Sequence, residues 1–335
     1  MESDEKRSTT KPMLIGLAVS LITIIVIFKL TETRVTWKVI LKADWRFLAL
    51  ALLLHTLFWF FWGVRLKQLT SMLNADIPLK YSLEISIAST FLAAITPSSA
   101  GGEPLRIKML SEKIPLGSAT AVVLAERILD AIFFVVALAV FVTLSGFATK
   151  FGFEVGAVFA VCLMGFMVFL YSIVKDERNI DRFSNWIQIK LGRFGEERAV
   201  RIAKRFREET LMFREALVNM LKNPLEKVFL SLLYTSLIWF SEFLVPSAIL
   251  LALNQDPAFL FSITAQFILV IISLIPLTPG SSGIAEAGMV YLYSKFVPQE
   301  VLGILVALWR FVTYYTNIIV GFFVNVRLLK SRYLS

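Results

Sequence analysis

Long runs of apolar residues, separated by short polar stretches, set the pattern of this chain. A helix that crosses a bilayer needs about 20 predominantly apolar residues. The runs that are long enough cover residues 13–30, 46–64, 118–147, 152–174, 227–253 and 301–326. The pattern therefore predicts an all-α polytopic membrane protein with about six full spans.

Two further apolar regions, 81–110 and 259–296, are interrupted near their centres. Both breaks contain proline followed by glycines: Pro97, Gly101 and Gly102 in the first region, and Pro279, Gly280 and Gly283 in the second. Proline removes a helical N–H and glycine relaxes the backbone. Each region is therefore predicted to form a re-entrant helix–turn–helix hairpin.

The placement of basic residues predicts how these elements are oriented. Lys and Arg outnumber Asp and Glu in the linker 175–226, so the positive-inside rule places it in the cytoplasm, as amphipathic helices at the membrane surface. The basic C-terminal tail, 330–335, belongs on the same side, as does the N-terminal tail, 1–12. Counting the spans between these segments then predicts that the first hairpin opens to the cytoplasm and the second to the outside. The basic residues of 31–46 fit badly, because the same count places them outside. Such a layout is typical of an inverted repeat.

The spacing of charged residues supports the repeat independently. Glu103 precedes Arg127 by 24 positions, and Glu286 precedes Arg310 by the same interval. A duplication explains the shared order with one cause. We therefore expect a single transmembrane domain over 13–329, with repeat one at about 13–147 and repeat two at about 227–329.

Composition removes several classes of function. Of the 335 residues, 57% are hydrophobic and 18% are charged, and the chain has one Cys and one His. A single Cys and a single His can close neither a disulfide framework nor a His/Cys metal cage. The net charge of +9 flanks the apolar runs, which favours a membrane over nucleic acid as the partner. No ATP-binding or dinucleotide motif is present, so we expect no metal and no cofactor.

Charged residues inside apolar helices are the candidate functional residues. A charge in a bilayer costs free energy unless it pairs with an opposite charge or lines a water-filled cavity. Arg127 and Asp130 are three positions apart and can pair on one helix face, whereas Glu126 points elsewhere. Restarting helices present free N–H groups, so the hairpins together with Arg127 and Arg310 could complete an anion site.

Structural roles are the alternative to anion binding for these charged residues. Arg127 and Asp130 could be a structural pair, and Glu103 and Glu286 could cap the restarting helices, neutralise the arginines or carry protons. His55, alone in an apolar span, is interpreted as a structural residue rather than a proton relay.

At these residues the chain resembles the flippase-like membrane region of lysylphosphatidylglycerol synthases, the multiple peptide resistance factor family. The motifs that carry the resemblance are Pro97 with Gly101-Gly102-Glu103 and Arg106, the run Glu126-Arg127-x-x-Asp130, the run Pro279-Gly280-x-x-Gly283-x-x-Glu286, and Trp309-Arg310. The resemblance implies a polytopic transporter of a phospholipid or lipid-linked molecule. The candidate substrate-binding residues are Arg127, Arg310, Glu103, Glu286, Arg106 and Asp130.

The sequence thus predicts a flippase for a phosphate-bearing membrane lipid, located in the plasma membrane if the source is prokaryotic. The alternative is a non-transporting accessory subunit whose partner is a glycosyltransferase or lipid-modifying enzyme. A membrane-embedded enzyme and a transporter of a soluble solute are further alternatives. We expect no enzyme activity of the two-part relatives, because no soluble aminoacyl- or sugar-transfer domain follows residue 326.

Overall fold

The computed structural model describes residues 42–96, 101–147, 149–175, 177–192, 196–274, 278 and 280–333, together with residues 22 and 25. Every regular element within these ranges is a helix. Apart from residues 22 and 25, the predicted span at 13–30 lies outside the described residues. The N-terminal tail and the two hairpin prolines, Pro97 and Pro279, also lie outside them.

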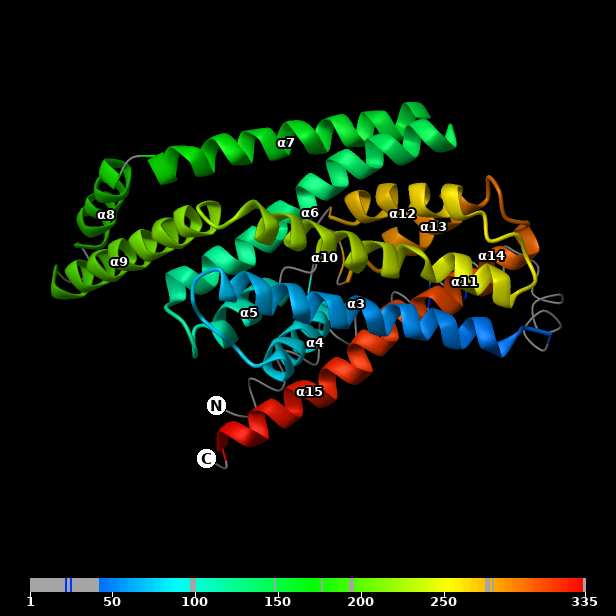
Figure 1. Ribbon diagram of the computed structural model, residues 1–335, viewed down its shortest axis with the longest axis horizontal. Coiled ribbons are helices and arrows are strands. Elements are labelled where there is room, and N and C mark those ends of the chain that lie inside the picture. Colours follow the sequence, from blue (N-terminus) through cyan, green and yellow to red (C-terminus); the bar gives the residue numbers. More distant parts are fainter. Residues whose placement is uncertain are drawn as a thin grey trace.

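Five helices of the described chain are long and apolar enough to cross a membrane. They are α3 (Trp45–Ser71), α6 (Leu116–Ser145), α7 (Thr149–Lys175), α10 (Leu225–Phe243) continued by α11 (Val245–Ala252), and α14 (Gln299–Arg310) continued by the π-helix η1 (Phe311–Tyr315) and α15 (Thr316–Tyr333). Each coincides with a predicted span, so the all-α polytopic fold is confirmed. Figure 1 shows them running largely along one direction.

The two interrupted regions form the predicted helix–turn–helix hairpins. The first consists of α4 (Leu79–Ile95) and α5 (Gly102–Leu110), and the second of α12 (Phe259–Ser273) and α13 (Ile284–Tyr293). None of these helices exceeds 17 residues, which is too short for a full span. Tyrosine hydroxyls close both hairpins at their open ends: Tyr81 donates to the carbonyl oxygen of Met109 at 2.7 Å, and Tyr293 lies 2.8 Å from the Ser262 hydroxyl.

The hairpins open at opposite ends of α3, a helix about 40 Å long. The first hairpin follows the C-terminal end of α3 after a short connection. At the other end, the Asp44 N–H donates to the carbonyl oxygen of Ala252 at 2.8 Å, and Ala252 ends the helix that precedes the second hairpin. Both hairpins therefore point into the bundle from opposite ends (Figure 1).

The tips of the hairpins meet in the middle of the bundle. The Gly280 N–H donates to the carbonyl oxygen of Thr96 at 3.1 Å. Gly280 has a positive φ of 55°, and a Cβ atom there would lie 2.5 Å from the Ala94 carbonyl oxygen and 2.5 Å from the Tyr314 ring. This contact therefore requires glycine.

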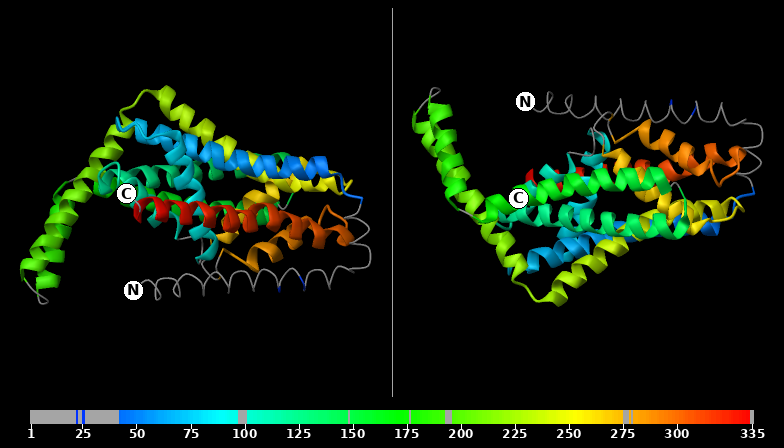
Figure 2. Two further views of the ribbon diagram at one scale, coloured as in Figure 1. Left: turned by 90° about the horizontal axis from the view of Figure 1, so that it is seen from below. Right: turned by 90° about the horizontal axis from the view of Figure 1, so that it is seen from above.

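The basic linker forms two helices, α8 (Glu177–Gly192) and α9 (Glu196–Leu221), which pack together as an arm that projects from the bundle (Figure 2). The arm is anchored at the start of α6, where the Gly117 N–H donates to the Glu209 carboxylate at 2.7 Å. The far end of α15 lies beside α4, as the contact of 3.8 Å between Arg327 and Glu84 indicates. Linker, C-terminal helix and first hairpin mouth thus share one end of the molecule.

Two apolar cores fill the ends of the bundle. One contains Phe134, Phe243 and Phe267, whose rings pack edge to face, and the other contains Leu66, Ile85 and Leu110. Along α6 the first core begins at Phe134 and the second ends at Val123, with Glu126, Arg127 and Asp130 between them. A polar layer therefore lies across the centre of the fold.

Candidate functional site

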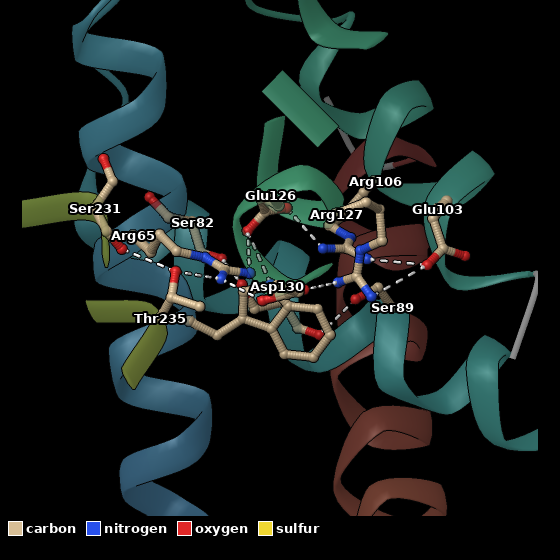
Figure 3. A network of polar contacts seen from close by, with 12 residues as sticks. Arg65, Ser82, Ser89, Glu103, Arg106, Glu126, Arg127, Asp130, Ser231 and Thr235 are labelled. Atoms are coloured by element: carbon tan, nitrogen blue, oxygen red, sulfur yellow. Dashed lines mark hydrogen bonds and ion pairs between the residues drawn. The ribbon is translucent and has the colours of Figure 1, made fainter. Parts of the chain in front are cut away.

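The most buried part of the polar layer is built on Arg65 of α3. Its guanidinium contacts Asp130 at 2.6 Å and Glu126 at 3.3 Å, both on α6, and donates to the Thr235 hydroxyl of α10 at 2.9 Å (Figure 3). All of these side chains are buried. Arg65 therefore ties three helices together through charge-assisted hydrogen bonds.

Arg106 carries the first hairpin into the same network. Its guanidinium contacts Glu126 at 2.7 Å and lies 4.6 Å from the ring centroid of Trp62, a cation–π contact. The Trp62 indole N–H donates to the other oxygen of Glu126 at 2.9 Å. Glu126 thus points away from Arg127, as its position on the helix predicts, and it fixes α5 against α3 and α6.

Arg127 is the accessible arginine of the cluster. Its side chain is 37% exposed, and it contacts Asp130 at 3.2 Å and Glu103 at 3.8 Å. Glu103 is itself 32% exposed, so this last pair is both the longest and the wettest contact of the network. The predicted pairing of Arg127 with Asp130 is present. Arg65 and the Trp239 indole bind the Oδ1 atom of the same carboxylate, whereas Arg127 contacts Oδ2.

Arg310 and Glu286, separated by the same 24 positions, form the corresponding pair beside the second hairpin. Glu286 accepts two hydrogen bonds from Arg310, each of 2.9 Å, and a third of 2.6 Å from the Gly283 N–H at the start of α13. Glu286 therefore both caps the restarting helix and neutralises the arginine. Glu286 thus occupies the Nε and Nη2 edge of the Arg310 guanidinium. In both regions, the Glu and Arg that are 24 positions apart are ion-pair partners.

A cavity of about 380 Å³ lies between the two hairpins. Both hairpins and four other helical segments contribute to its wall, and its charged lining residues are Glu103, Arg106, Arg127, Glu242 and Arg310. The structure thus brings Arg127 and Arg310 to one central space, together with the hairpin residues Gly102 and Gly280. Glu286 stands behind Arg310 and is not among the lining residues, and Asp130 lies outside this cavity.

An apolar groove of about 320 Å³ adjoins the cavity. Its walls come from α6, α7, α10 and α12, and its apolar lining residues include Phe134, Phe159, Leu163 and Phe166. Arg127, Trp239, Val270 and Leu274 line both the groove and the cavity. Asp130 lines the groove instead of the cavity. A cavity with charged lining residues and an apolar groove therefore share a wall that contains Arg127.

Sequence reasoning missed several members of this site. Arg65 directly follows a predicted span and resembles an ordinary flanking charge, while Trp62 and Trp239 resemble interfacial tryptophans. Glu242, inside the span 227–253, was the available signal, since a carboxylate in an apolar helix is costly. Within the described residues, no group of three or more His, Cys, Asp and Glu side chains is placed to hold a metal ion.

Comparisons with known proteins agree with this architecture. The family model for the lysylphosphatidylglycerol synthase transmembrane region matches residues 13–321. A UPF0104 membrane protein of Archaeoglobus fulgidus is 47% identical over 324 residues, which are 96% of this chain and 99% of that protein. UPF0104 membrane proteins of Methanothermobacter thermautotrophicus and Pyrococcus horikoshii are 26% and 23% identical, over 76% and 96% of this chain and 76% and 97% of their own lengths. No solved structure matches the chain.

Proposed function

Because the chain belongs to the family of the lysylphosphatidylglycerol synthase transmembrane region and is an integral membrane protein, we propose that it moves a phosphate-bearing lipid between the leaflets of its membrane. The headgroup binds in the central cavity, and the acyl chains lie in the adjoining apolar groove. The membrane is the plasma membrane, with the basic linker and both termini in the cytoplasm.

The observation that carries this proposal is the shared wall between cavity and groove. A soluble anion needs only a polar chamber, and a fully apolar ligand needs only the groove. An amphiphile needs both side by side, with the charged contact at their junction. Arg127 lies at that junction, lined by apolar residues on one side and by the charged cavity on the other.

Within the site, Arg127 is the principal phosphate ligand. Its contact with Glu103 is 3.8 Å long and partly exposed, so a phosphate can replace that carboxylate at small cost. Arg65 and Arg106 are buried and held at 2.6 and 2.7 Å by carboxylates, and Arg310 is held by two hydrogen bonds. Arg106 and Arg310 line the cavity and contribute to its positive potential, whereas Arg65 lies outside it and holds Asp130 and Glu126 in place.

Access to the two leaflets follows from the hairpins. They enter the bundle from opposite ends and meet at their tips through the hydrogen bond between Gly280 and Thr96. Separation of the tips, with one hairpin moving while the other stays packed, would open the chamber to one end at a time. Alternating access of this kind is the usual use of paired inverted elements around a midplane site.

A flippase assay on purified protein tests the proposal. The protein is reconstituted into liposomes that contain tail-labelled fluorescent phosphatidylglycerol, and dithionite is added outside. We expect dithionite to bleach lipid that began in the inner leaflet, at a rate that rises with protein and falls to the protein-free rate in Arg127→Ala.

Other outcomes assign the alternatives. Transport that needs an added glycosyltransferase or lipid-modifying enzyme would make the chain an accessory subunit. Uptake of radiolabelled phosphate without lipid movement would make it a solute transporter. Either result overturns the flippase proposal.

A further inference from the structure

A second buried polar group lies against the wall of the cavity and is centred on His55. His55 of α3 is 1% exposed and lies between Glu242 of α10 and Asn317 of α15. Its Nδ1 atom is 2.7 Å from Glu242 Oε2, and its Nε2 atom is 3.3 Å from Asn317 Oδ1. Glu242 and Asn317 line the cavity, whereas His55 stands behind them.

The orientation of the Asn317 amide is fixed by its other neighbours. The indole N–H of Trp59, which can only donate, lies 2.9 Å from Oδ1. The amide nitrogen of Asn317 donates to the Thr313 carbonyl oxygen. The Asn317 atom that faces His55 is therefore the oxygen, and this assignment follows from the hydrogen-bond network.

Both ring nitrogens of His55 thus face acceptors. A neutral imidazole has one N–H and one lone pair, so it would leave a nitrogen lone pair against either the carboxylate or the amide oxygen. The imidazolium, with an N–H on both nitrogens, satisfies both contacts. Alternatively, the ring is neutral with its N–H on Nε2, and a protonated Glu242 donates to the lone pair of Nδ1. In both arrangements, His55 and Glu242 together hold one more proton than a neutral histidine beside an ionised glutamate.

We infer that His55 and Glu242 form a proton-binding site in the cavity wall and that its occupancy is linked to binding of the anionic headgroup. The proton site stands on its own geometry, and its linkage to a headgroup rests on the proposed function. Glu242, with a side chain 17% exposed, connects the buried imidazole with the cavity, through which a proton can enter.

The charges around the pair set the direction of the linkage. Among the described charged side chains, Glu242 contacts His55 directly, and the cavity presents Glu103, Arg106, Arg127 and Arg310 on its other walls. Further along α3, Arg65 is held by Glu126 and Asp130. Loss of the proton leaves a net negative charge at Glu242 in the same chamber as the phosphate. Anion and proton therefore favour each other's binding, and by linkage the effect is reciprocal.

A structural connection joins the two sites. Arg310 directly precedes the π-helix η1, and Asn317 follows it by two positions. Single π-helical turns are rare and concentrate at functional sites. A shift of this turn would move Arg310 and Asn317 together, so the wall of the headgroup cavity and the proton site would change at once.

Nuclear magnetic resonance of His55 tests the proton site directly, because His55 is the single histidine of the chain. Protein labelled with ¹⁵N-histidine in lipid nanodiscs yields one imidazole signal pair. At pH 7 we expect the imidazolium pattern, or a ring whose Nδ1 proton is shared with Glu242. In Glu242→Gln, which keeps size and removes the charge, we expect the ordinary neutral tautomers. An unshared neutral imidazole in the wild-type protein at pH 7 would overturn the inference.

The linkage is tested with fluorescent phosphatidylglycerol in the liposome assay at several pH values between pH 5.5 and 8.5. Wild-type transport should slow as the pH rises, and Glu242→Gln should lose most of this dependence. Glu300→Gln, an exposed carboxylate outside the cavity, should keep it. A pH dependence equal in all three proteins overturns the linkage. Absence of any transport counts against the proposed function, while the resonance experiment still decides the proton site.

Discussion

Glu286 accepts both of the guanidinium hydrogen bonds that Arg310 directs at it, at 2.9 Å each, and both side chains are buried. Glu103 and Arg127, which are separated by the same 24 positions, are 3.8 Å apart and about one third exposed. The two Glu–Arg pairs therefore differ in contact and burial. The buried pair is held tightly, and we propose that the exposed pair exchanges partners with the lipid phosphate.

Removing one member of the buried pair should destabilise the protein. Arg310→Met leaves Glu286 charged and without its main partner in a dry site, at a cost of about 3–5 kcal/mol. We expect a lower melting temperature in detergent. The double variant Glu286→Gln with Arg310→Met should recover part of the loss because no charge remains unpaired. Equal melting temperatures for the wild-type protein and Arg310→Met would contradict this assignment.

The contact between hairpin tips predicts a strong effect at Gly280. In Gly280→Ala, the new methyl group would lie 2.5 Å from the Ala94 carbonyl oxygen, at a φ that alanine rarely adopts. We expect a loss of stability of about 1–3 kcal/mol together with slower lipid transport. Gly165→Ala is the matched control, since nothing lies within 4 Å of the added atom and its helical backbone is ordinary. Similar melting temperatures for the two variants would show that the tips are not tightly packed.

The opposed hairpin mouths predict opposite accessibility. Lys113 follows the first hairpin and Lys295 the second, and both are exposed. In a Cys162→Ala background, an impermeant maleimide should label Lys113→Cys and Lys295→Cys from different sides of right-side-out vesicles. Permeabilised vesicles, in which both should react, control for reactivity. Labelling of both positions from one side would refute the inverted arrangement.

The groove predicts a difference between neighbouring residues of α7. Leu163 lines the groove, while the adjacent Met164 is 62% exposed and is not among the lining residues. Leu163→Trp should fill space meant for an acyl chain and slow lipid transport several-fold, and Met164→Trp should have little effect. The fluorescent-lipid assay at matched protein levels measures both. Equal rates for the two variants would exclude the groove from the lipid path.

Most of the fold could be predicted from the sequence because each membrane span or hairpin break depends on residues within one segment. Five predicted spans and both hairpins are present, since apolar length and Pro/Gly breaks act within one segment. The repeated interval between Glu and Arg also predicted correctly that Arg127 and Arg310 share a space. Their unequal pairing could not be read from the same interval, because it depends on side-chain distances in the folded protein.

For the same reason, the sequence could not identify the partners that His55 and Arg65 find on other helices. The sequence predicts a structural His55 with satisfied hydrogen bonds, and the structure gives it two partners, but the sequence could not identify them because Glu242 and Asn317 come from helices far along the chain. Arg65 sits at the edge of its apolar run, where a basic residue is ordinary, and only the packing of α3 against α6 buries it. Such contacts are set by tertiary structure: the sequence marks Glu242 as an unusual charge in an apolar span, but it does not say which helix supplies the partner.

The most direct test of the account is lipid transport by Arg127→Ala. Asp130 keeps Arg65 and Trp239 on its Oδ1 atom in this variant and loses the contact at Oδ2, so the protein should still fold and insert, with at most a small fall in melting temperature. Transport of fluorescent phosphatidylglycerol should fall to the protein-free rate, and Arg127→Lys should recover only part of it because the ammonium lacks the guanidinium fork. Arg207→Ala, on the exposed arm, should transport normally. Full transport by a well-folded Arg127→Ala protein would contradict the central claim that this arginine binds the lipid phosphate.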